Sequence, residues 1–256
     1  MDYFFTLGLI LFCYMSAWFV LSLVKKRNDV ADTAWGLGFV LLAWTSFYLG
    51  HAQDTRGLLV GFLVSIWGIR LAWHIHSRNK GKTEDYRYAK WREEWGTWFY
   101  VRSYVQVYLL QGFLLFLIVL PTLCINKSIA PSLGIFDFVG VAFWIFGFIF
   151  ESVGDAQLAR FIKDPANKGK LMQSGLWRYT RHPNYFGEVT MWWGVWLLAL
   201  SVPYGFLSII GPIAITILIL KVSGIPMLEK KMLENPEFAE YKRRTSIFVP
   251  WFRKSM

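Results

Sequence analysis

Long apolar stretches separated by short basic segments dominate the chain. Cutting the sequence at its charged residues leaves apolar stretches at residues 3–24, 34–49, 58–73, 105–124, 133–153, 185–200 and 204–220. A helix of about 20 residues crosses the hydrocarbon core of a bilayer, which is about 30 Å thick. The pattern therefore predicts an all-α, polytopic membrane protein with about seven transmembrane helices, built as a single integral membrane domain over residues 1–256.

The distribution of basic residues predicts the orientation. The chain has 27 Lys and Arg against 17 Asp and Glu, a formal net charge of +10, and nearly all of the cations follow the first, third, fifth and seventh stretches. Because cytosolic loops carry such an excess, we expect the N-terminus outside and the C-terminus in the cytosol. Topology explains the charge, so we expect no nucleic-acid partner. The first stretch has no small-residue cleavage site, and we expect it to remain as a span.

Two long polar segments, residues 74–102 and 154–184, fall on the predicted cytosolic side. The earlier one contains Asn79-Lys80-Gly81-Lys82, in which a glycine turn lets the backbone approach a ligand and the lysines can meet phosphates. The alternative interpretation is a juxtamembrane amphipathic helix that attracts anionic lipid, with its tryptophans at the headgroups.

The later segment leads into an apolar stretch that contains an acid. Pro183 suits a helix start, and Glu188 lies four residues after Asn184 on the same helix face. An acid inside a span is costly and is a functional candidate by default, for which Arg181 and His182 would supply the countercharge. The alternative is an interfacial anchor whose cations extend toward lipid phosphates.

Ionisable residues inside other spans are further candidates. Asp32 lies at the start of the second stretch, one turn from Trp35, and its alternative role is to complement the helix dipole. Arg70 lies inside the third stretch and needs a carboxylate partner or a polar cavity. The four histidines show no zinc-binding spacing, so we expect no metal site.

The run Arg181-His182-Pro183-Asn184-Tyr185-Phe186-Gly187-Glu188 resembles the R-H-P-N-Y-x-G-[DE] signature of the sterol reductases. Together with the tail, which contains Glu229, Tyr241 and Val249-Pro250-Trp251-Phe252, it resembles the C-terminal region of the membrane steroid 5α-reductase family, including a bacterial group of uncharacterised membrane proteins. Isoprenylcysteine carboxyl methyltransferases share a similar run. The Asn79 to Lys82 stretch is similar to the N-R-G-R with which 5α-reductases contact NADPH, and it favours the reductases.

The resemblance implies that NADPH is the cofactor and that residues 154–256 form most of its binding region. Residue by residue, it implies cofactor contacts for Asn79, Lys80, Lys82, Asp155, Lys163, Lys170, Arg181, His182, Asn184, Tyr185, Glu188 and Tyr241. Lysines offer point charges in place of the bidentate forks of arginine, which match phosphate better.

The steroid enzymes also use a Glu and a Tyr from early spans to polarise the substrate carbonyl. The nearest counterparts by spacing are Asp32 and Trp67, followed by Arg70, and Trp35 joins them as a substrate-binding candidate. Since Trp has no acidic hydroxyl, the resemblance leaves the proton donor open among Tyr86, Tyr88 and Tyr179.

These observations predict an NADPH-dependent reductase in the bacterial inner membrane that transfers hydride to the C=C of an apolar enone, such as a 3-oxo-Δ4-steroid or a related lipid. The substrate enters from the bilayer among the membrane lipids. One alternative is an S-adenosylmethionine-dependent methyltransferase of the isoprenylcysteine carboxyl type. Another is a non-enzymatic lipid-binding protein whose basic loops hold anionic headgroups.

Overall fold

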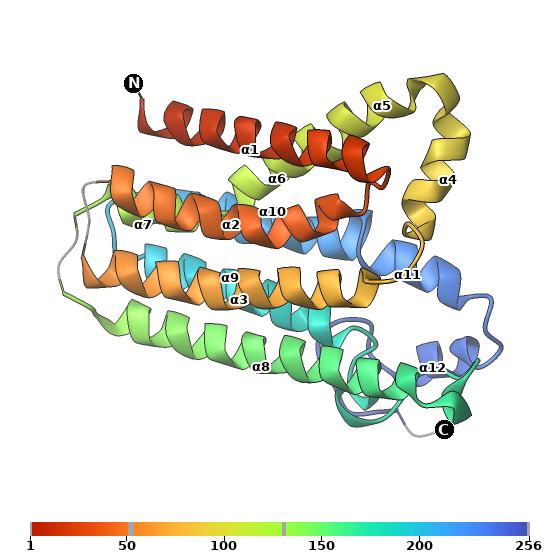
Figure 1. The fold of residues 1–256 in the computed structure, drawn as a ribbon. Helices are drawn as coiled ribbons and strands as arrows, with labels where there is room; N and C mark the ends of the chain where they lie inside the picture. Colours follow the sequence, from red (N-terminus) through yellow and green to blue (C-terminus); the bar gives the residue numbers. More distant parts are fainter. Residues whose placement is uncertain (1, 51–53, 130–131, 255–256) are drawn as a thin grey trace. The chain divides into compact units, whose positions relative to one another are not determined.

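The computed structural model describes residues 2–50, 54–129 and 132–254. These residues form α-helices joined by short 3-10 and π-helical stretches (Figure 1). No strand occurs among them, and one isolated bridge pairs Thr180 with Ser246. The predicted all-α class is confirmed.

The helices follow the apolar stretches of the sequence, with ends set by local signals. Asp2, Asp54 and Asp85 cap α1, α3 and α4 by accepting backbone N–H bonds in the first turn. The bounds are α1 (Tyr3–Lys25), α2 (Val30–Leu49), α3 (Thr55–Asn79), α4 (Tyr86–Trp95), α5 (Phe99–Arg102), α6 (Leu110–Ile118), α7 (Leu120–Lys127), α8 (Ile135–Lys163), α9 (Pro183–Ala199), α10 (Ile210–Ile217), α11 (Ile225–Met232) and α12 (Phe238–Arg244).

Among the described residues, six helical segments are long and apolar enough to cross a membrane, so the chain is a multi-pass membrane protein. They are Tyr3–Lys25, Val30–Leu49, Thr55–Asn79, Tyr86–Ile118, Ile135–Lys163 and Gly205–Met232. The remaining expected stretch, 185–200, lies on α9, which has 17 residues and is shorter than these six segments. The count of seven spans and the orientation of the termini stay predictions.

The fourth expected span, 105–124, differs most from the structure. The helical segment begins earlier, at Tyr86, and bends at Gly96, whose φ of +49° favours glycine. It ends at Ile118, and a new helix starts with Pro121 in its first turn, where the missing N–H of proline costs nothing. In Figure 1, α4 consequently runs across the direction of α1, α2 and α3.

The chain divides into two compact units. Unit 1 comprises Met1–Gly134 and Ala199–Gly211, and unit 2 comprises Ile135–Leu198 and Pro212–Met256. The single integral membrane domain over residues 1–256 stays a prediction.

In unit 1, α2 and α3 lie side by side because glycines face each other across the contact (Figure 1). A Cβ added at Gly36 would lie 2.6 Å from the carbonyl oxygen of Gly68, and the reverse substitution meets the Gly36 carbonyl at 2.6 Å. Without side chains at these positions, the two backbones approach closely. The contact fixes the start of α2, which carries Asp32.

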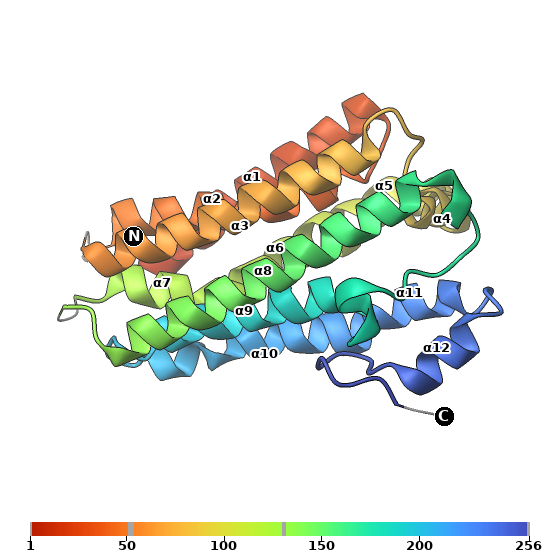
Figure 2. The ribbon, with the colours of Figure 1, turned by 90° about the horizontal axis from the view of Figure 1, so that it is seen from below.

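In unit 2, α9 runs along α8 (Figure 2) over glycines spaced by seven residues. A Cβ added at Gly140 would lie 2.6 Å from the Gly194 carbonyl oxygen, and one at Gly147 would lie 2.5 Å from the Gly187 carbonyl oxygen. The close approach continues to Gly154, which faces the backbone of Asn184. It therefore determines where the end of α8 meets the start of α9.

Candidate functional site

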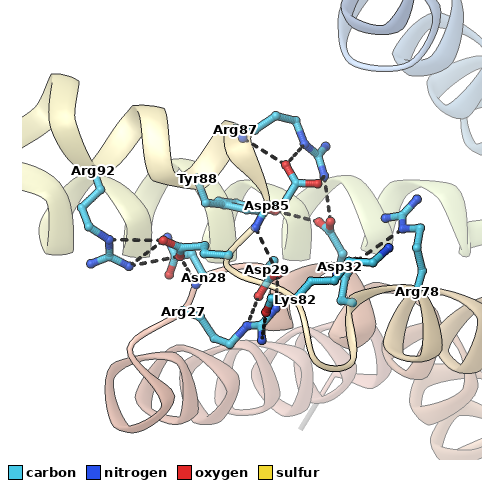
Figure 3. Close-up of polar contacts among 12 residues, drawn as sticks. Arg27, Asn28, Asp29, Asp32, Arg78, Lys82, Asp85, Arg87, Tyr88 and Arg92 are labelled. Carbon is cyan, nitrogen blue, oxygen red and sulfur yellow. Dashed lines mark hydrogen bonds and ion pairs between the residues drawn. The ribbon is translucent and has the colours of Figure 1, made fainter. Parts of the chain in front are cut away.

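Charged residues of unit 1 gather where α2 and α4 begin (Figure 3). We call Asp29, Asp32, Asp85, Arg87 and Tyr88 the Asp32 cluster. Asp32 lies in the first turn of α2, Asp85 caps α4, and Arg87 and Tyr88 follow in the first turn of α4. Packing at the ends of these helices thus brings together residues separated by more than fifty positions in the chain.

The centre of the Asp32 cluster is a carboxylate with two donors. The Tyr88 hydroxyl donates to Oδ1 of Asp32 at 2.7 Å, and Nη2 of Arg87 donates to Oδ2 at 2.8 Å. Tyr88 is 2% exposed, whereas the Asp32 side chain keeps 15% exposure. A phenol is therefore held in the protein interior against a carboxylate that a ligand can still approach.

The other two carboxylates of the cluster, Asp85 and Asp29, each bind an arginine. Nε of Arg87 donates to Asp85 at 2.9 Å, and Arg27 holds Asp29 through bonds of 2.7 and 2.6 Å. Burial raises the pKa of the Asp85 carboxyl, but the hydrogen bonds and charge of Arg87, with the charge of Arg78, together outweigh burial and bring that pKa below its usual value. Arg87 is thus oriented by Asp85 while it binds Asp32.

The predicted phosphate-binding stretch lies beside this cluster. Asn79 is the last residue of α3, and Lys80 and Lys82 are exposed in the turn that follows, where the N–H of Lys82 donates to the carbonyl of Asn79 at 3.2 Å. Figure 3 shows Arg78 and Lys82 next to Asp32. The turn therefore presents cations at the edge of the cluster.

Other residues predicted for unit 1 occupy different surroundings. Trp67 is 1% exposed and packs edge-on against Phe39, and Trp35 packs edge-on against the same ring. Arg70 is half-buried on α3. Tyr86 is 50% exposed at the start of α4, so of the tyrosines in this segment it is Tyr88 that meets Asp32.

In unit 2, the predicted Arg181 and His182 are buried around one carboxylate. Arg181 donates through Nε to Glu229 at 2.8 Å and through Nη1 to the Lys242 and Thr245 carbonyls. Nε2 of His182 lies 3.2 Å from the same Glu229 oxygen. Burial and the charge of Arg181 together lower the pKa of His182 more than Glu229 raises it, so the imidazole is neutral at pH 7.

The predicted Asp155 and Asn184 also meet. Nδ2 of Asn184 donates to Oδ1 of Asp155 at 3.1 Å across the close contact of α8 and α9. One turn further along α9 lies Glu188, half-buried, and Tyr185 stacks on the His182 ring at a centroid distance of 5.8 Å. These four predicted residues therefore occupy one end of the α8–α9 pair.

The remaining predicted residues of unit 2 divide into exposed and buried ones. Lys163 ends α8 and Lys170 lies in the following loop, both exposed. Tyr241 is 2% exposed on α12; its hydroxyl donates to the Trp177 carbonyl at 2.6 Å, and burial raises its pKa. Tyr179 is 40% exposed, and its carbonyl accepts the N–H of Trp251.

Unit 2 also contains an apolar cavity of about 580 Å³. It is bordered by Phe143, Phe146, Phe186, Trp193 and Phe248. The cavity has the size of a small-molecule site, and aromatic walls suit an apolar ligand. The polar groups on its walls are satisfied internally, since Trp193 donates to Thr216 and Thr216 to the Pro212 carbonyl.

Sequence reasoning missed two parts of these sites. It left the phenol open among three tyrosines, although Tyr88 begins an aromatic face that continues through Trp91 and Trp95 at helical spacing. It also placed Glu229 in the tail without its role as the shared partner of Arg181 and His182. In the part of the chain that the structure describes, no group of three or more His, Cys, Asp or Glu is placed to hold a metal ion.

Comparisons with known proteins identify relatives without an established activity. The family described as "Protein of unknown function (DUF1295)" matches residues 18–245. An uncharacterized protein of Schizosaccharomyces pombe, C594.04c, is 26% identical over 69% of this chain. The match covers 56% of the yeast protein, so the chain spans about half the length of this curated relative. No solved structure matches the chain.

Proposed function

The chain belongs to the DUF1295 family, whose members are membrane proteins similar to the steroid 5α-reductases, and from this premise we propose that it is an NADPH-dependent membrane reductase. Its substrate is an apolar enone, such as a 3-oxo-Δ4-steroid or a related lipid, which enters from the bilayer of the bacterial inner membrane. The observation that carries the proposal is the hydrogen bond from the buried Tyr88 to the partly exposed Asp32 in unit 1.

Reduction of an enone moves negative charge onto the carbonyl oxygen as hydride reaches the β-carbon. A hydrogen-bond donor held in a water-poor site stabilises that oxygen strongly, because it needs no reorganisation when the charge appears. The Tyr88 hydroxyl is such a donor: it is fixed by Asp32, and Arg87 fixes Asp32 in turn. In our proposal the substrate carbonyl takes the place of Asp32 as the acceptor of the Tyr88 hydroxyl, which keeps its proton. The α-carbon of the resulting enolate then takes one proton from solvent water.

Some of the residues expected to hold the cofactor suit NADPH, and one does not. NADPH supplies the hydride when bound, and its phosphates need exposed cations, which Lys163 and Lys170 offer in unit 2. The Asp155–Asn184 pair and Glu188 offer hydrogen bonds to ribose hydroxyls and amides. Arg181 does not fit a phosphate ligand, because its guanidinium is buried on Glu229 and backbone carbonyls. We therefore assign Arg181 to holding the fold of the binding region.

A thermal-shift experiment tests the cofactor. Purified protein is heated with NADPH, with NADH or with S-adenosylmethionine, and only the true ligand raises the melting temperature at modest concentration. We expect the NADPH shift to disappear in Asn184→Ala and Glu188→Ala and to persist in the control Glu234→Ala, which alters an exposed acid of the same unit. A shift with S-adenosylmethionine alone would favour the methyltransferase and overturn the proposal.

A turnover experiment tests the phenol. NADPH oxidation is followed with a panel of lipid-soluble enones for the wild type, Tyr88→Phe and the control Tyr48→Phe, which is 68% exposed on α2. Removing a donor to the developing oxyanion lowers the rate about 100- to 1,000-fold. We therefore expect this loss in Tyr88→Phe alone. Full activity in Tyr88→Phe, with loss in Tyr86→Phe, would show that the assignment to Tyr88 is wrong.

A further inference from the structure

Unit 1 contains a polar cavity of about 300 Å³ where α1 ends and the segment after α4 begins. We call it the Lys26 pocket. Its walls include Ser22, Lys26, Asn28, Arg92 and Tyr100. Two of these residues are cations, and no carboxylate among the described residues lines the pocket, so its lining suits an anion.

The two cations are available in different ways. Lys26 is exposed and forms no ion pair within the described ranges. Arg92 is fixed: Nε and Nη2 bind Glu84 at 3.3 and 3.1 Å, and the guanidinium lies 4.1 Å from the centre of the Phe99 ring. These bonds leave Nη1 without a hydrogen bond among the described residues. The pocket thus combines a preorganised guanidinium, whose charge is balanced by Glu84, with the adaptable ammonium group of Lys26.

One wall of the pocket is built from buried polar groups. Asn28 is 3% exposed and lies beside Arg92 (Figure 3). Its Nδ2 donates to the Ser103 hydroxyl at 2.8 Å, and its N–H donates to Glu84. Ser103 opens the π-helical stretch Ser103–Leu109, a type of helix that is rare and frequent at functional sites. The helix distortion therefore supports this wall of the pocket.

Exposed apolar side chains next to the pocket indicate its depth in the bilayer. Leu23 is 41% exposed, Tyr100 57% and Trp98 64%, and Lys25 lies in the last turn of α1. Aromatic and basic residues together mark the headgroup level of a membrane, with the apolar side chains facing the acyl chains. A ligand in the Lys26 pocket can thus carry its anion between the cations and its tails along Leu23 and Tyr100.

We propose that the Lys26 pocket binds the phosphate group of an anionic phospholipid. Lys26 supplies the positive charge that meets the phosphate, and Nη1 of Arg92, whose Nε and Nη2 bind Glu84, donates a hydrogen bond to it. The exposed apolar side chains contact the acyl chains. The predicted orientation places this end of α1 in the leaflet that carries most anionic lipid. This site is separate from the Asp32–Tyr88 pair and does not depend on the proposed reductase activity.

Lipid binding is measured on the whole protein by native mass spectrometry and by melting temperature. The protein in detergent is titrated with phosphatidylglycerol, with phosphatidylcholine or with inorganic phosphate. The test variant is Lys26→Asn, because Lys26 has a φ of +54° and asparagine accepts this left-handed conformation. The control is Lys25→Gln, which removes the neighbouring charge outside the pocket, and Arg92→Lys tests whether the fixed guanidinium is required.

We expect the wild type and Lys25→Gln to prefer phosphatidylglycerol to phosphatidylcholine, and Lys26→Asn to bind phosphatidylglycerol about five-fold more weakly. Arg92→Lys keeps the charge, so a loss there with retained melting temperature supports the role of the guanidinium. Equal losses in Lys26→Asn and Lys25→Gln would overturn the pocket in favour of general surface attraction. Protection by inorganic phosphate equal to that by phosphatidylglycerol would overturn the assignment to a lipid.

Discussion

The close contact of α8 and α9 predicts that Gly147→Ala destabilises unit 2. A Cβ at Gly147 would lie 2.5 Å from the carbonyl oxygen of Gly187, 2.8 Å from the backbone nitrogen of Met191 and 2.9 Å from its Cγ. Two of these atoms belong to the backbone, which has no rotamer with which to move aside. The methyl group therefore has to push α8 and α9 apart.

The matched control is Gly8→Ala on α1, where an added Cβ meets nothing within 4 Å. Overpacking costs about 1–3 kcal/mol, whereas alanine gains up to about 1 kcal/mol over glycine inside a helix. The gain in helix propensity applies to both variants and therefore cancels when they are compared. Gly147→Ala should then be about 1–3 kcal/mol less stable than Gly8→Ala. For a domain of this size, that is a difference in melting temperature of roughly 2–12 °C.

Both variants are unfolded by heating in the same detergent, and tryptophan fluorescence reports the melting temperature. The NADPH shift is a second readout, because the spacing of α8 and α9 sets the 3.1 Å bond between Asn184 and Asp155. We expect the shift to shrink in Gly147→Ala and to be unchanged in Gly8→Ala. A Gly147→Ala protein that melts at or above the Gly8→Ala temperature would refute the close contact.

Two further predictions concern the buried groups around Glu229. Arg181→Ala leaves the Glu229 carboxylate without its guanidinium and should lower the free energy of unfolding by about 3–5 kcal/mol. The control Arg160→Ala, which alters an exposed arginine, should lower it little. Equal melting temperatures for the two variants would contradict the buried ion pair. The pKa of His182 in the folded protein lies below its ordinary value of 6.5, so the unfolded chain binds the extra proton first and stability falls as pH drops below 6.5 toward the folded pKa. Melting curves against pH should show this decline in the wild type and a smaller decline in His182→Asn; an identical decline in both would assign it to another group.

The sequence predicts the helices well because the signal for each span is local. The first expected span, 3–24, differs from α1 by one residue, since the apolar run is followed by three basic residues, Lys25 to Arg27, and the helix ends at the first of them. The second begins four residues early, at Val30, because the polar Asp32 belongs to the first turn of α2. Hydropathy places such a polar first turn outside the helix, although an acid there is favoured by the helix dipole.

The partners of the polar residues lie far away in the sequence, so hydropathy and helix-end signals do not predict them. Asp32 and Tyr88 are 56 positions apart, and Arg181 and Glu229 are 48 apart. Residues two apart on a helix point in nearly opposite directions, so only one of Tyr86 and Tyr88 can face Asp32. Which one does so depends on how α4 is rotated about its axis after its cap at Asp85. The pattern of apolar residues does not predict that rotation.

The arginines and the lysines that give the chain its net charge of +10 have different surroundings. Arg87 and Arg181 each bind a carboxylate and a further oxygen, as a planar guanidinium with five donors allows. The lysines that the family resemblance assigns to the cofactor, Lys163 and Lys170 among them, are exposed. Removing Arg181 should therefore lower stability, whereas removing the exposed lysines should weaken anion binding at constant melting temperature, so the two kinds of variant separate the folding of the binding region from its occupation.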